Sequence, residues 1–194
     1  MFVVRLLSRQ ILIHLVLITA LILTALASLS ISPIYAFTQE SATVFINEIH
    51  YDNTGADTGE AVEIAGPAGV DLTGWSLVLY NGSGGAAYTT IPLAGIIADQ
   101  GGGFGTVVVD APGLQNGSPD GLALVDNGAL IQFLSYEGGF TAVDGPAAGL
   151  ASTDIAVAEP GDTPVGFSLQ LAGTGTVYQD FTWSGAAANT FGAF

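Results

Sequence analysis

The sequence contains no cysteine and only two basic side chains, Arg5 and Arg9. Without cysteine, the chain has no disulfide framework, no thiolate metal site and no cysteine nucleophile. Because both arginines lie within the first nine positions, the 17 Asp and Glu residues have no lysine or arginine after position 9 to balance their charge. The part of the chain after position 9 has no lysine or arginine to neutralise nucleic-acid phosphates or to clamp a transferring phosphoryl group. Nucleic-acid binding and phosphoryl transfer are thus disfavoured from the outset.

Residues 1–36 have the layout of a secretory signal peptide. The two arginines precede an apolar run over residues 11–23, and Ala36 provides a small residue before the expected cleavage point. The apolar stretch also approaches the roughly 20 residues that span a bilayer, so an uncleaved anchor is the alternative. In both cases we expect residues 37–194 to be exported to the cell envelope, the periplasm or the extracellular space, because the positive flank stays inside.

After residue 36 the chain has little helical character. All 27 glycines lie in this part, and no stretch beyond residue 40 keeps a 3.6-residue apolar period. Short apolar runs separated by turn residues predict an all-β sandwich or barrel instead. The strands are expected near residues 43–50, 60–65, 74–80, 87–92, 104–110, 121–126, 129–136, 153–158, 166–171 and 177–183.

Local patterns refine this prediction. Trp75, Leu77 and Leu79 alternate with residues on the other side of their strand, which is typical of a buried face. Asn127-Gly128 between two apolar runs indicates a tight hairpin. A long loop is expected over residues 138–152, and a small-residue C-terminal tail over residues 184–194.

An ordered set of segments resembles the lamin tail domain family in its secreted bacterial form. These are an opening strand with Asn47-Glu48, a second strand with Val62-Glu63-Ile64, and Gly74-Trp75 at the head of a third. The later segments 118–125, 166–171 and 180–183 are similar to the family's closing strands. Ala61 departs from the pattern, because the family usually has an aromatic residue there.

The resemblance implies an immunoglobulin-like β-sandwich domain over residues 37–183 that serves as a non-catalytic interaction module. In exported bacterial proteins this domain often accompanies nucleases, phosphatases or other hydrolases. No hydrolase pattern accompanies it in this sequence, so the expected partner is a protein or another envelope or extracellular component. The alternatives are an accessory module for a separately encoded secreted nuclease or phosphatase, and a calcium-dependent surface protein. Because a sandwich scaffold does not fix function, the site residues must decide.

His50 is the only histidine after residue 36. A catalytic or zinc role would require carboxylate partners, and Glu48 lies on the same face of the predicted strand. The simpler interpretation is a strand-end side chain that is hydrogen-bonded locally or faces water. No G-x-S-x-G elbow is present, and the glycine-rich segment 101–105 precedes a strand rather than a helix. We therefore expect no enzyme activity and assign no catalytic residues.

The segment from Asp52 to Glu60 is a loop rich in acidic and glycine residues. Calcium is bound by six to eight oxygen atoms, which flexible loops of this composition can provide. Asp52, Asp57 and Glu60 are the candidate ligands, although the spacing does not match an EF-hand. The competing interpretation is that Asp and Asn simply form turns here.

The partner's contact surface is expected to include exposed aromatic residues, with Tyr88, Tyr136 and Phe140 as candidates. The uncompensated negative charge should also oppose compaction, and salt should relieve that repulsion.

Overall fold

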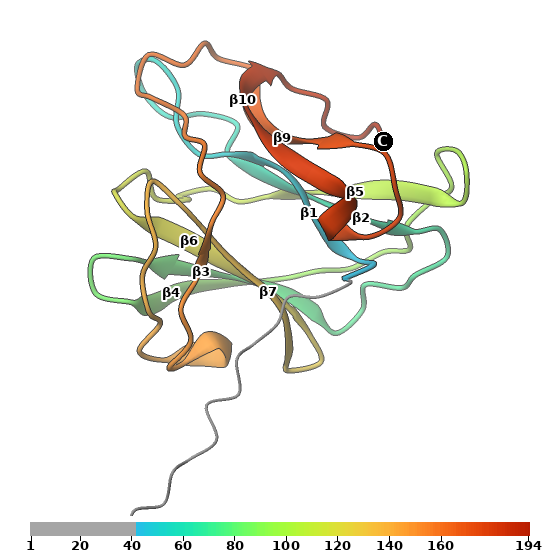
Figure 1. Ribbon diagram of the computed structural model, residues 1–194, viewed down its shortest axis with the longest axis horizontal. Coiled ribbons are helices and arrows are strands. Elements are labelled where there is room, and N and C mark those ends of the chain that lie inside the picture. Colours follow the sequence, from blue (N-terminus) through green and yellow to red (C-terminus); the bar gives the residue numbers. More distant parts are fainter. Residues whose placement is uncertain (1–41) are drawn as a thin grey trace, which may run out of the picture. The chain divides into compact units, whose positions relative to one another are not determined.

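The computed structural model describes residues 42–194, which fold into two stacked β-sheets of five strands each (Figure 1). The expected signal peptide lies outside the described residues. The first sheet has the strand order β10-β9-β1-β2-β5, and the second has the order β4-β3-β6-β7-β8. The all-β sandwich predicted from the sequence is thereby confirmed. Within residues 42–194 no helix is long and apolar enough to cross a bilayer.

The first sheet is antiparallel throughout. Its strands are β1 (Phe45–His50), β2 (Ala61–Pro67), β5 (Phe104–Asp110), β9 (Phe167–Gly173) and β10 (Phe181–Ala188). The one-turn 3-10 helix η2 (Tyr178–Asp180) precedes β10. β10 continues to Ala188, so the sandwich extends beyond the domain boundary expected at residue 183.

The second sheet is antiparallel except for the short parallel strand at its edge. Its strands are β3 (Trp75–Asn81), β4 (Ala86–Pro92), β6 (Asp120–Asp126), β7 (Ala129–Tyr136) and β8 (Thr153–Asp154). A second 3-10 helix, η1 (Gly145–Ala147), lies between β7 and β8. The predicted hairpin is confirmed, because Asn127 and Gly128 connect β6 to β7 with φ angles of 44° and 87°.

Two strand predictions near the C-terminus differ from the structure. The strand expected over residues 153–158 ends at Asp154, whose carboxylate accepts the backbone N–H of Ala156 at 3.0 Å while Ala156 takes a φ of 62°. The strand expected over residues 177–183 begins only at Phe181, because the Asp180 carboxylate accepts the N–H groups of Thr176 and Val177 and closes a turn. In both places an aspartate side chain replaces ladder hydrogen bonds with a turn.

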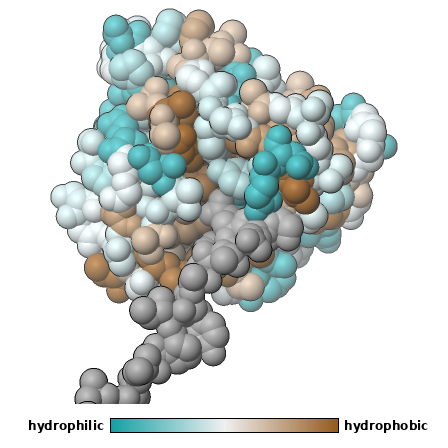
Figure 2. Space-filling model, in the orientation of Figure 1, coloured by the Kyte–Doolittle hydropathy of each residue, from teal (hydrophilic) through white to brown (hydrophobic). Residues whose placement is uncertain are grey.

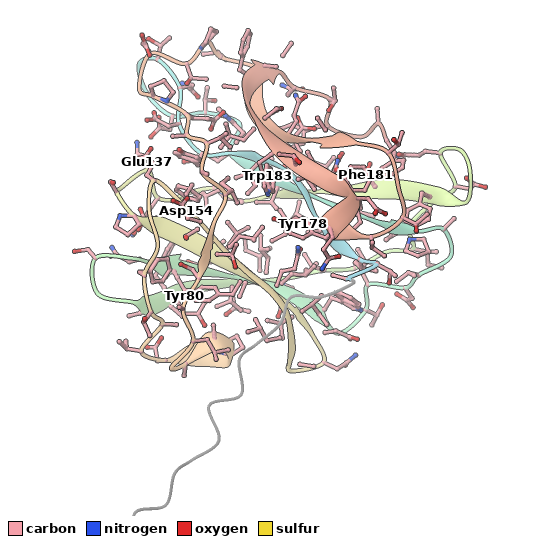
Figure 3. The ribbon with its side chains drawn as sticks, in the orientation of Figure 1. Tyr80, Glu137, Asp154, Tyr178, Phe181 and Trp183 are labelled. Atoms are coloured by element: carbon pink, nitrogen blue, oxygen red, sulfur yellow. The ribbon has the colours of Figure 1, made fainter. Side chains whose placement is uncertain are left out.

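The main core lies between the sheets and contains alternate side chains from each. Leu77 and Leu79 of β3 meet Ile49 of β1 in this cluster, and Trp75 packs against its border. The buried alternation predicted for β3 is therefore confirmed. At one end of the first sheet, Phe45 contacts the rings of Tyr178 and Phe181 at centroid distances of 6.1 and 5.5 Å. The Trp183 ring N–H donates to the Tyr178 hydroxyl at 2.9 Å; Tyr178, Phe181 and Trp183 of this C-terminal segment are labelled in Figure 3.

The outer face of the second sheet has its own apolar core. Tyr80 of β3 and Phe133 of β7 are buried there beneath residues 138–152, which we call the cover loop. Phe140 of the cover loop meets Phe133 edge-on at 5.3 Å, and the Tyr80 hydroxyl accepts the backbone N–H of Ala147 at 3.1 Å. The long loop predicted over residues 138–152 thus packs as a second hydrophobic layer.

The outer face of the first sheet is polar by contrast. Glu48 and Glu63 lie directly opposite each other on β1 and β2, and neither side chain is exposed. Residues 189–194, which we call the tail, pass over them. On the side of the molecule drawn in Figure 2, hydrophobic residues form small separate patches among hydrophilic ones.

Candidate functional site

The side chain of His50 is buried at the end of β1, with both ring nitrogens facing acceptors. Nδ1 lies 3.0 and 3.2 Å from the two carboxylate oxygens of Glu159, and Nε2 lies 3.2 Å from the carbonyl oxygen of Thr58. A neutral imidazole carries one N–H and could donate to only one of these groups. The geometry therefore favours the doubly protonated, positively charged ring.

The electrostatics agree with this geometry. The hydrogen bond that His50 donates to the Glu159 carboxylate raises the pKa of His50 above its ordinary value of 6.5, although burial partly opposes that rise. His50 is thus the one side chain after residue 36 that can carry a positive charge at neutral pH. Its ion pair with Glu159 is the only one in the part of the chain that the structure describes.

Glu159 anchors residues 155–165, which we call the strap, to the end of β1. Its carboxylate accepts the backbone N–H of Tyr51 at 2.6 Å and that of Asp52 at 3.0 Å, in addition to the His50 ring. The side chain is fully buried, so these donors replace the water that a charged carboxylate otherwise requires. Hydrogen bonding between distant chain segments therefore fixes the strap here.

A second link between the strap and the sheets runs through Tyr51. Its hydroxyl donates to Glu137 at 2.9 Å and accepts the backbone N–H of Glu159 at 2.7 Å. Its ring stacks on that of Tyr136 with centroids 3.9 Å apart and planes 13° apart. Burial raises the pKa of both tyrosines, so both hydroxyls stay protonated and can act as donors.

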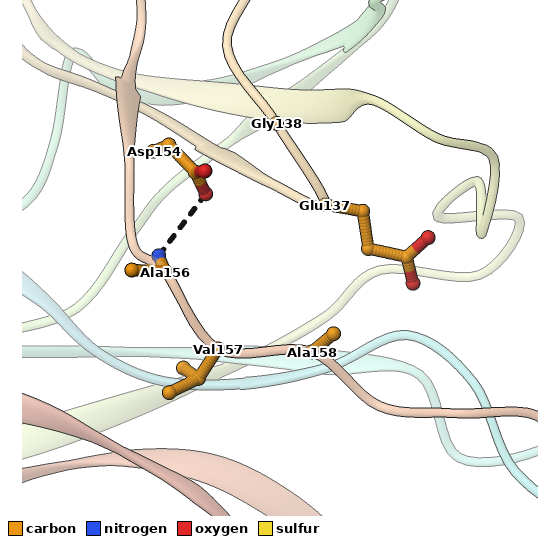
Figure 4. Close-up of a pocket in the computed structure, with 6 residues that line it drawn as sticks. All are labelled: Glu137, Gly138, Asp154, Ala156, Val157 and Ala158. Carbon is orange, nitrogen blue, oxygen red and sulfur yellow. Dashed lines mark hydrogen bonds between the residues drawn. The ribbon is translucent and has the colours of Figure 1, made fainter.

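A pocket of about 210 Å³ lies beside this network (Figure 4). Glu137 and Gly138 form one side and Asp154 another, while the strap contributes Ala156, Val157 and Ala158. Two carboxylates thus flank an apolar wall. This lining suits a group that combines positive charge with a hydrocarbon stem, such as a lysine or arginine side chain.

The loop of the three calcium candidates is shaped by Asn53. The Asn53 side-chain oxygen accepts the N–H of Thr58, and its amide group donates to the carbonyl oxygens of Thr54 and Ala56. Asn53 is buried, so the loop is folded around its side chain. This is the turn-forming role of Asn that the composition of the segment also allowed.

The structure brings two of the three calcium candidates together. Burial raises the pKa of Asp52, and the neighbouring Asp57 carboxylate adds to that rise. Glu60 instead accepts the backbone N–H of Gly113 at 2.9 Å. Across residues 42–194 no cluster of three or more acidic or histidine side chains is arranged to hold a metal ion. Calcium binding at Asp52, Asp57 and Glu60 stays a prediction that titration must decide.

The aromatic contact residues suggested by the sequence are placed differently. Tyr136 is completely buried under Tyr51, and Phe140 packs in the cover loop. Tyr88 is half-buried; its hydroxyl accepts the N–H of Gln115, and burial raises its pKa to about 12. The expectation of an exposed contact ring is therefore wrong for Tyr136, whereas Tyr88 and Phe140 are partly exposed and their role in a contact stays a prediction.

Sequence reasoning missed the residues that organise this end of the sandwich. Glu159 precedes a Pro-Gly pair that is typical of a turn, and Glu137 is one of 17 acidic residues, so neither has a pattern that distinguishes it. His50 and Glu159 are separated by 109 positions, and only the fold brings them together. The sequence offered one hint: His50 is the single ionisable basic side chain after residue 36 among many carboxylates, so one of these could be expected beside it.

Comparisons with protein-family models, curated proteins and solved structures found no match to this chain.

Proposed function

We propose that residues 37–194 form an exported, non-catalytic binding module of the lamin tail type, with an immunoglobulin-like sandwich. Its partner is a protein or another component of the envelope or extracellular space. The two-sheet architecture and the resemblance in segments such as 45–53 and 72–82 support this proposal. Accessory action beside a separately encoded secreted hydrolase is one form that such binding could take.

The observation that carries the proposal is the engagement of His50. Both of its ring nitrogens are bonded, and the ring is buried beneath the strap. A general base must reach the proton that it abstracts, and a metal-binding histidine needs a free ring nitrogen. His50 meets neither requirement, so its role here is to hold loops together.

The surface best suited to a partner is the pocket between Glu137 and the strap. Its two carboxylates belong to a chain that has no lysine or arginine after residue 9, so attraction at long range favours a basic partner. Electrostatic complementarity of this kind governs the rate and specificity of association more than its final strength. The pocket therefore points to a partner that presents a lysine or arginine side chain.

Affinity capture on immobilised residues 37–194 tests the binding role. Extracts of the native secreted and envelope fractions should yield a retained partner, and the paired changes E137Q and D154N should reduce its retention. The paired changes D71N and D126N, at the β6–β7 hairpin end of the second sheet, remove two charges elsewhere and serve as the matched control. Equal retention by all three proteins would show that the pocket is not the contact surface.

The proposed role of His50 has a separate test. In an NMR titration of residues 37–194, the His50 ring should titrate above pH 6.5, and E159Q should lower that pKa. Substrate turnover that disappears in H50Q while the fold is retained would contradict the non-catalytic assignment.

A further inference from the structure

The tail crosses the outer face of the first sheet from one side to the other. The Asn189 N–H donates to the carbonyl oxygen of Gly166, just before β9. Next along the tail, Thr190 lies over Glu48 of β1 and Gly192 over Glu63 of β2. Finally, the ring of Phe194 stacks on Phe104 of β5 at a centroid distance of 5.7 Å.

The two buried glutamates are arranged to receive an extended chain. Glu48 accepts the Thr190 backbone N–H at 2.8 Å and the Thr190 hydroxyl at 2.7 Å. Glu63 accepts the N–H of Gly192, two residues further on, at 2.5 Å. Because opposite residues on neighbouring strands stand side by side, the carboxylate pair presents acceptors to alternate residues of a crossing segment.

The tail is held from one side only, and mainly by polar contacts. Thr190, Gly192 and Phe194 remain exposed, with half of the Phe194 surface open to solvent. Both phenylalanines of the tail are partly covered, Phe191 to an intermediate degree and Phe194 by half. The apolar surface that opening exposes is therefore mainly that of these two rings and of Phe104 beneath Phe194, and water can solvate both carboxylates afterwards. Segments bound in this way open locally at a lower free energy than the core.

We propose that the carboxylate pair Glu48/Glu63 is an exchangeable binding site for an extended segment, and that its second occupant is the tail of another copy of this chain. An opened copy presents a vacant site together with a free tail that matches it. Two such copies can exchange tails and recover the same contacts, as in other swapped dimers. This proposal does not depend on the function proposed above.

Cysteine cross-linking tests the exchange, because the chain has no cysteine of its own. Q100C and A193C introduce thiols beside a tail contact, since the Gln100 side-chain amide donates to the Gly192 carbonyl oxygen at 3.1 Å. Each single variant has one thiol and cannot link to itself within a chain. A mixture of the two, incubated at high concentration and treated with a short bifunctional thiol reagent, should give a covalent heterodimer.

Three matched proteins make the result decisive. The double variant Q100C/A193C should cross-link within one chain when dilute, which shows that the thiols are correctly placed. Replacing Q100C by A129C, on the β6–β7 hairpin of the other sheet, measures random collision and should give several-fold less heterodimer. Adding T190V to A193C removes one contact with Glu48 from the closed and the exchanged tail alike, so it should open the tail more readily and speed formation of the heterodimer.

Light scattering on the unmodified chain should show a dimer fraction that grows with concentration. The proposal is overturned if the double variant cross-links internally while the mixed single variants give no more heterodimer than the A129C control. It is also overturned if T190V leaves the rate of heterodimer formation unchanged, because that outcome means that release of the tail from Glu48 is not part of the exchange.

Discussion

The two outer faces of the sandwich are covered in opposite ways. The cover loop buries Phe133 and Tyr80 of the second sheet under apolar side chains. The tail covers Glu48 and Glu63 of the first sheet through main-chain N–H groups and one hydroxyl. Removing the cover loop would expose apolar side chains to water, which costs free energy. Removing the tail breaks hydrogen bonds that water can replace, which costs less. The comparison predicts one permanent layer and one removable layer in the same small domain.

Removing a ring from the apolar cover should have the largest effect. Phe133 is almost fully buried between Tyr80 and Phe140, so F133A leaves a cavity as well as losing contacts. We expect a loss of about 3–5 kcal/mol in the free energy of unfolding, measured by urea denaturation. F133L should lose much less. A loss below about 1 kcal/mol for F133A would mean that the cover loop is not a true hydrophobic layer.

The polar cover should respond more weakly to a comparable deletion. T190V removes the hydroxyl that donates to Glu48, and it should cost about 1 kcal/mol because water can take over that bond. In T190V, amide hydrogen exchange should be faster than in the unmodified chain at residues 190 and 192 of the tail. It should stay slow at Ala147, whose N–H donates to Tyr80 in the cover loop. Equal acceleration at all three amides would remove the distinction between the covers.

A pH series sharpens the comparison further. Burial raises the pKa of Glu63 above its ordinary value of 4.5, so the folded state binds the proton more tightly than the unfolded state. The resulting stabilisation is fully present below pH 4.5 and is lost as the pH rises through the raised pKa. E63Q should remove this part of the pH dependence of the melting temperature. An unchanged profile in E63Q would assign the effect to other carboxylates.

Salt should produce the smallest and least local effect. The negative charges repel one another, and the screening length shortens from about 30 Å at 0.01 M salt to about 3 Å at 1 M. The melting temperature should therefore rise from low-salt buffer with chelator to about 0.5 M salt. A further rise on adding calcium to the low-salt buffer, absent in D52N and D57N, would support the calcium hypothesis. Identical values in every buffer would contradict both expectations.

Local sequence patterns predicted most of the strands and little of what covers them. Alternation in β3 and Asn127-Gly128 in the hairpin act between near neighbours, so they can be recognised along the chain. The tail contacts join residues more than a hundred positions apart, and no local pattern records them. Glu48 and Glu63 resemble the solvent-facing residues of an ordinary strand, yet both are buried.

The candidate site shows the same division. Asp52 and Asp57 lie in one loop, and their proximity follows from its shortness. Glu60 is the last residue of the same loop before β2, but its carboxylate accepts the Gly113 N–H from a neighbouring segment. The pairing of His50 with Glu159 could not be predicted, because it depends on the strap passing beside the end of β1, which the whole topology determines.

The early end of β8 affects how the molecule meets copies of itself. A sheet edge with free N–H and C=O groups invites strand-to-strand polymerisation, and many proteins discourage it with lysine. This chain has no lysine to use. It instead limits the edge strand to Thr153–Asp154 and turns the backbone aside at Ala156, while the opposite edge strand ends in Pro92, which has no N–H to donate. At both edges of the second sheet, backbone geometry thus limits strand-to-strand pairing without lysine.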